Sequence, residues 1–120
     1  MSKLELTKSH FTDLREAVAE TIEMGWYPMV LREPAGFSED LHFHKFPNLT
    51  FMFQGTMTFV DGEGEKYETE AGDRILIPAE AVHMGTSDDE LVFVFSTPEP
   101  IWLGDKLAYD PKELANGGST

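Results

Sequence analysis

The sequence contains no cysteine among its 120 residues. Disulfide bridges, zinc–thiolate sites and thiol catalysis are therefore excluded, and the core must form by apolar burial alone. Long apolar runs are absent as well, and charged side chains interrupt the first twenty residues. No stretch approaches the length of a signal sequence or a membrane span. We therefore expect a cytoplasmic protein.

Basic side chains are scarce. Nine lysines and arginines stand against 22 acidic residues, and the formal net charge is −13. Such a chain repels phosphate backbones and anionic membranes over a screening length of about 8 Å. We expect no nucleic-acid and no membrane partner, and a small molecule instead. The length fits one compact domain, so we expect residues 1–120 to form a single domain.

The N-terminal segment, residues 1–26, has the pattern of an amphipathic helix. Between Thr12 and Met24 the apolar residues recur on one face at helical spacing. Asp13, followed three residues later by Glu16, predicts a capping box at the start of this helix. Gly25 and Pro28 end it.

Residues 27–97 change to short apolar or alternating runs that are separated by Gly, Pro and Asp turns. Several short strands at such spacing are typical of an all-β sandwich or barrel. In the segment 98–120, Trp102 and Tyr109 are apolar residues suited to anchor it, and Asn116–Thr120 is predicted to be a mobile tail. The predicted strands are Met29–Arg32, Leu41–His44, Leu49–Gln54, Met57–Val60, Lys66–Thr69, Arg74–Ile77 and Leu91–Phe95.

Two histidines, His42 and His44, lie two residues apart in one predicted strand. Their imidazoles therefore project from the same strand face, while Phe43 points to the other. Two adjacent imidazoles can bind a transition metal. They can equally be polar residues that share a strand face by chance, so the pair alone does not establish a site.

The surrounding spacing resembles the two sequence motifs of the cupin superfamily, G-x5-H-x-H-x3-E-x6-G and G-x5-P-x-G-x2-H-x3-N. The matching positions here are Gly36, His42, His44, Gly55, Gly72, Pro78 and His83. The resemblance implies a jelly-roll-like double-stranded β-helix, the cupin barrel, over residues 27–97, preceded by the N-terminal α-helix. It also implies one divalent transition metal (Fe, Ni, Zn, Mn or Co) held by His42, His44 and His83.

The chain departs from these motifs at three positions. Asn48 stands in place of the glutamate, Glu80 in place of a glycine and Ser87 in place of the final asparagine. An asparagine amide is neutral, so Asn48 is at best a weak or indirect ligand. A metal on three neutral imidazoles keeps its full charge and leaves a position open for a substrate oxygen.

The run after Asn48 predicts the lining of a pocket. If this strand alternates regularly, Thr50, Met52 and Gln54 face the barrel interior and form a substrate pocket near the metal. Thr50 and Met52 can equally be ordinary interior filling. Asp40, two residues before His42, can reach the site as a base or hydrogen-bond partner, but a solvated loop acid beside Glu39 is the simpler interpretation.

Two functions remain open. The first is a metalloenzyme, a non-haem oxygenase or an isomerase- or decarboxylase-type enzyme, that acts on a small organic molecule. The second is a non-catalytic cupin that binds or senses a small ligand, and the fold does not separate the two. No residue is assigned a catalytic role.

The apolar pattern also predicts a homodimer. The outward residues Leu49, Phe51 and Phe53, and a last strand at Leu91–Phe95 that is apolar on both faces, need a cover that one barrel interior does not supply. Either a second subunit or the Thr12–Met24 helix with the C-terminal segment provides it.

Overall fold

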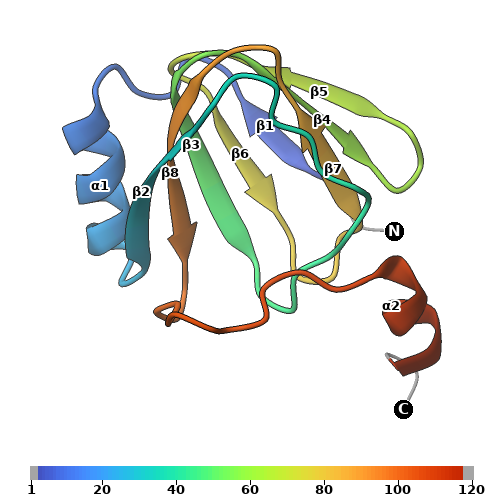
Figure 1. Cartoon of the computed structure of the whole chain (residues 1–120). Coiled ribbons are helices and arrows are strands. Elements are labelled where there is room, and N and C mark those ends of the chain that lie inside the picture. The colour runs from blue at the N-terminus through green and yellow to red at the C-terminus, as the bar shows by residue number, and fades with distance from the viewer. Residues whose placement is uncertain (1–2, 118–120) are drawn as a thin grey trace.

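The structure, a computed structural model, describes residues 3–117. These residues form eight strands and two helices, which Figure 1 shows as a β-barrel-like body with a helix on one side. Short strands form here because β-branched and aromatic residues alternate with polar ones between Gly and Asp turns. The strands are β1 (Glu5–Thr7), β2 (Tyr27–Glu33), β3 (Asn48–Gln54), β4 (Met57–Asp61), β5 (Lys66–Thr69), β6 (Arg74–Ile77), β7 (His83–Thr86) and β8 (Leu91–Thr97).

The strands make two antiparallel sheets. One has the order β1-β6-β3-β8-β2 and the other the order β5-β4-β7. The apolar side chains of their inner faces pack together as the main core of the molecule, as expected for an all-β fold with an N-terminal helix. The buried members of this core are Leu4, Met52, Met57, Phe59, Tyr67, Ile75, Ile77, Ala81, Leu91 and Phe93.

One predicted strand is wrong in kind. Leu41–His44 forms no continuous ladder, because it pairs only through single bridges, His42 with His83 and Phe43 with Tyr109. Each residue here finds its partner on a different segment, so the pairing cannot extend along either one. Conversely, β1 and β7 were not predicted: β1 is only three residues long, and Gly85 interrupts the apolar pattern of β7.

The N-terminal helix is confirmed, with bounds Leu14–Glu23 (α1). Asp13 Oδ1 accepts the Glu16 N–H at 3.0 Å and Glu16 Oε1 accepts the Asp13 N–H at 2.9 Å, which is the predicted capping box. The helix lies against the outer face of the five-stranded sheet (Figure 1), where Thr21 Oγ1 is 2.6 Å from Ser96 Oγ. The buried cluster beneath it consists of Phe11, Ala17, Leu49, Phe51 and Val94.

This cluster reduces the exposed apolar surface on which the predicted dimer depends. Leu49 and Phe51 are buried within the single chain. The helix covers these two residues, which is the alternative to a second subunit that the sequence left open. Val30, which pairs with Val94 and so lies on the same outer face, stays 53% exposed, and Phe53 is 36% exposed. Among the described residues of that sheet, the large apolar side chains left exposed are these two and Tyr27 of β2, at 48%.

The C-terminal segment after β8 crosses one end of the barrel and continues into α2 (Pro111–Gly117), as Figure 1 shows. Asn116 and Gly117 lie in this helix, so the predicted tail does not begin at residue 116, and residues 118–120 lie outside the described residues. Tyr109 anchors the segment by stacking on Phe43 with ring centroids 5.5 Å apart. Trp102 does not, since it is 68% exposed. In residues 3–117, neither helix is long and apolar enough to cross a membrane.

Candidate metal centre

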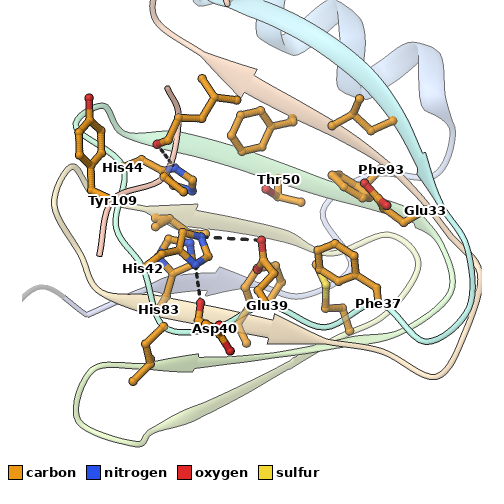
Figure 2. Close-up of a pocket in the computed structure, with 18 of the residues that line it drawn as sticks. Glu33, Phe37, Glu39, Asp40, His42, His44, Thr50, His83, Phe93 and Tyr109 are labelled. Carbon is orange, nitrogen blue, oxygen red and sulfur yellow. Dashed lines mark hydrogen bonds and ion pairs between the residues drawn. The ribbon is translucent and has the colours of Figure 1, made fainter. Parts of the chain in front are cut away.

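A cavity of about 520 Å³ opens between the two sheets, within the size range of small-molecule sites. Its walls, seen in Figure 2, are mostly apolar and come from strands of both sheets, from residues 37–44 and from the C-terminal segment. Four carboxylates line the cavity as well, and among the described residues no lysine or arginine does. The lining includes Glu33, Phe37, Glu39, Asp40, Thr50, Phe93, Phe95, Leu107, Tyr109 and Asp110.

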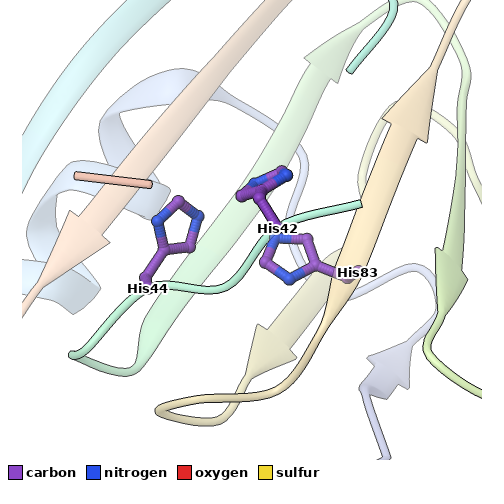
Figure 3. A group of neighbouring side chains, drawn as sticks. All are labelled: His42, His44 and His83. Carbon is purple, nitrogen blue, oxygen red and sulfur yellow. The ribbon is translucent and has the colours of Figure 1, made fainter. Parts of the chain in front are cut away.

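Three imidazoles converge on one side of this cavity. His42 and His44 come from the segment before β3 and His83 is the first residue of β7, and Figure 3 shows the three rings facing one another. One ring nitrogen of each lies within 4.8 Å of those of the other two. His42 and His83 are buried, with 8% and 2% of their surface exposed, and His44 is partly buried.

Main-chain carbonyls determine the tautomer of all three histidines. Each Nδ1 lies 2.8 Å from a carbonyl oxygen, His42 from Asp40, His44 from Leu107 and His83 from Ala81. Because a carbonyl can only accept, each Nδ1 carries the proton and each Nε2 presents a lone pair. Within residues 3–114 no hydrogen bond is formed at these Nε2 atoms.

The environment also keeps two of the imidazoles neutral. The pKa of His83 is lowered to about 3, mainly by burial and in part by the nearby His42 and His44, while the hydrogen bond to Ala81 opposes the change. Burial likewise lowers the pKa of His44. At neutral pH these two side chains are therefore uncharged bases, the form that binds a metal.

The donor set fits one divalent transition metal. Neutral imidazole nitrogens suit Zn, Fe, Ni and Co, and three of them leave at least one position open in a tetrahedral or octahedral sphere. The hydrogen bonds from the three Nδ1 atoms are the outer partners that histidine ligands usually have.

Asn48, the weak or indirect ligand expected from the sequence, lies in the interior. It is fully buried on β3 and is not among the residues that line the cavity. Its Oδ1 is 3.4 Å from Thr50 Oγ1, and its Nδ2 has no hydrogen-bond partner within residues 3–114. A buried amide donor without a partner is unusual and marks this position as one that a neighbouring group or water must satisfy.

The three residues predicted to line the pocket lie in three different places. Thr50 lines the cavity, whereas Met52 is part of the packed core, the filling role left open above. Gln54 is exposed and does not line the cavity, so its prediction is wrong. The register shifts between Met52 and Gln54, and the resulting β-bulge pairs Gln54 with Val92 on the outer face.

Two contributions to the site were missed in the sequence. Glu39, to which the sequence assigned no role, places Oε2 3.7 Å from His42 Nε2 (Figure 2), while the neighbouring Asp40 is exposed, as expected of a solvated loop acid, and offers its carbonyl. Burial raises the pKa of Glu39, and Glu33 adds to the rise, whereas His42 and Gly85 oppose it. The second contribution is the Leu107 carbonyl, 63 residues away from His44 in the chain. No sequence signal reports either, because both depend on long-range pairing.

Comparison with known proteins gives structural similarity alone. No family model and no curated protein matches the sequence. Among solved structures, a DUF861 family protein from Thermotoga maritima is similar at a TM-score of 0.56 and 14% identity, over 78% of this chain and 97% of that one. A cupin superfamily protein from Desulfitobacterium hafniense has a TM-score of 0.54 at 12% identity, over 79% and 76%.

A third neighbour, KdgF from Halomonas sp., has a TM-score of 0.54 at 22% identity, over 63% of this chain and 72% of that one. At such identities the likeness concerns the fold and leaves activity open. The spacing of the two histidine motifs, the two antiparallel sheets and these neighbours agree with one another. The chain therefore has the fold of a small cupin.

Proposed function

We propose that this protein binds one divalent transition metal through the Nε2 atoms of His42, His44 and His83 and acts as a metalloenzyme on a small organic molecule. One observation supports this above all others. Three Nδ1 atoms are committed to main-chain carbonyls, and the three remaining nitrogens face one another beside a cavity of about 520 Å³. A polar face without a ligand would not need all three rings in the same tautomer.

The lining of the cavity limits the substrate. Aromatic and aliphatic walls favour an apolar body, and Glu33, Glu39 and Asp110 disfavour any anionic group away from the metal. We propose a neutral or cationic molecule, largely apolar, with one oxygen donor directed at the histidines. The bound metal would supply Lewis-acid polarisation of that donor, which isomerase- and decarboxylase-type reactions use.

The residues around the metal have separate roles in this proposal. The histidines would hold the ion, and Phe95, whose ring centroid lies 6.1 Å from that of His44, would exclude water from the space beside them. The Thr50 hydroxyl is available to orient the substrate. A carboxylate beside the centre, Glu39, can accept or return a proton, and this group favours an enzyme over a binding module.

Metal analysis tests the proposal. Wild-type protein, purified without added metal, is analysed for elements and then stripped and titrated with Zn²⁺ or Co²⁺ by calorimetry. We expect one ion per chain and a loss of at least about 100-fold in affinity for His83→Ala. His10→Ala is the matched control, because His10 lies outside the centre, with Nε2 2.7 Å from Glu20.

The outcomes separate the alternatives. Absence of stoichiometric binding by wild type, or equal binding by His83→Ala, overturns the metal centre. Stoichiometric metal without turnover or oxygen uptake on any neutral or cationic substrate screened supports the non-catalytic module instead.

A further inference from the structure

We propose that Glu39 supplies the carboxylate ligand of the metal centre, replacing the charge that Asn48 cannot provide. The inference rests on the proposed function, since it concerns the same ion. The expected position for this ligand is residue 48, nine residues later and on a different segment, so the proposal assigns the role to a residue outside both histidine motifs.

The distance between Glu39 and His42 is the first argument. Oε2 and Nε2 are 3.7 Å apart, too far for a hydrogen bond. Two atoms that bind one ion at about 2.1 Å and at 90–110° are separated by roughly 3.0–3.4 Å. A small rotation of the flexible glutamate side chain closes this difference.

The charges give the second argument. His42 Nδ1 donates to the Asp40 carbonyl, so Nε2 faces Glu39 with a lone pair. A carboxylate oxygen and a lone pair repel unless a cation lies between them. The Glu39 side chain is only 32% exposed, and no lysine or arginine of the described residues lines its cavity. A mostly hidden carboxylate needs a positive partner, and a divalent ion is the one this arrangement fits.

The backbone holds Glu39 in place beside the centre. Its N–H donates to the Gly85 carbonyl at 3.1 Å, and Ser38 bridges to Thr86, so the loop lies along β7, the strand that begins with His83. Gly85 also leaves room for the carboxylate, because a Cβ there would lie 3.2 Å from Glu39 Oε1. The same strand therefore positions one imidazole and the carboxylate.

Two charge-removing variants of adjacent acids test the proposal. Glu39→Gln removes the proposed ligand, and Asp40→Asn removes an equal charge from the next residue, which also lines the cavity but is exposed. Both are titrated with Co²⁺ as stripped full-length protein, with chelator competition for affinity and visible absorption for coordination. We expect Glu39→Gln to lose at least about tenfold in affinity with an altered absorption band, and Asp40→Asn to change less than about threefold.

The failures are distinguishable. If Glu39→Gln keeps wild-type affinity and spectrum while His83→Ala loses binding, the three-histidine centre stands and the assignment of Glu39 as a ligand is overturned. If both acid variants weaken binding equally, the effect is long-range charge and the ligand assignment is overturned. If His83→Ala binds Co²⁺ as tightly as the wild type does, the proposed function itself is overturned.

Discussion

The two ends of the chain attach to the barrel in different ways. At the N-terminus, α1 covers the outer sheet face with apolar contacts, and Ala17 and Phe51 are completely buried between them. At the C-terminus, residues 98–110 keep large apolar side chains such as Trp102 in solvent. Their contribution is a main-chain carbonyl, that of Leu107, on the ligand His44.

The two attachments differ in what they contribute: one stabilises the fold, and the other positions a residue of the site. Apolar burial contributes most of the folding free energy, and this contribution scales with the buried area. We therefore expect the N-terminal attachment to stabilise the folded protein more than the C-terminal attachment does. A single hydrogen bond contributes about 1 kcal/mol, yet it determines which ring nitrogen of His44 faces the cavity. We therefore expect the C-terminal attachment to affect the geometry of the metal centre more than it affects stability.

Phe51→Ala should break the N-terminal attachment. The variant removes a fully buried ring between the sheet and Phe11, whose ring centroid lies 5.7 Å away, and we expect a loss of about 3–5 kcal/mol in unfolding free energy. Urea denaturation of the metal-free protein measures it. Metal affinity of the folded variant should stay within about threefold of wild type, and a large drop would contradict the separation.

Asp73→Asn should weaken the same end through polar contacts. The Asp73 carboxylate accepts from Lys8 Nζ and from the N–H groups of Ser9 and Glu70. We expect a loss of about 2 kcal/mol at pH 7, because buried donors lose a charged acceptor.

This loss should depend on pH. Burial alone would raise the pKa of Asp73, but the hydrogen bond from Lys8 and those from the backbone outweigh it and lower the pKa below 3.8. The stabilisation is therefore complete above pH 3.8 and disappears as the pH falls through the lowered value. Urea midpoints of wild type and variant should converge as the pH falls below 3.8, and a difference that stays constant throughout the acid range would argue against an ionised Asp73.

Tyr109→Ala should break the C-terminal attachment. Its ring stacks on Phe43, with Lys45 and Lys106 Nζ over it at 4.5 and 4.3 Å from the centroid. Without this anchor the Leu107 carbonyl moves away from His44, and we expect metal affinity to fall about fivefold or more. Trp102→Ala is the control for loss of an aromatic side chain from the same segment. Equal affinities of the two variants would refute a role of this segment in the centre.

Disruption of the expected homodimer should have the smallest effect on the stability of the single chain. We propose that it forms through Val30 and Phe53, the outer-face residues that α1 leaves exposed. Val30→Asp with Phe53→Ser should leave the unfolding free energy nearly unchanged and convert a dimer to a monomer in light scattering. A wild-type monomer at micromolar concentration excludes the dimer.

The histidine cluster could be predicted, while its carboxylate could not. His42, His44 and His83 stand at spacings that resemble known motifs, and the structure brings them together. The regular alternation of β3 placed Leu49 and Phe51 outside and Thr50 and Met52 inside, as observed. It failed at Gln54, because a bulge adds one residue and reverses the face of all that follow.

The sequence by itself determined what depends on near neighbours: the capping box of Asp13 and Glu16, and strand alternation up to the bulge. Only the tertiary structure decided that Glu39, through Gly85 of β7, lies beside His42, and that the Leu107 carbonyl orients His44. The physical reason is range. Caps and alternation follow from backbone geometry over a few residues, whereas these contacts join segments that approach one another only when both sheets have closed.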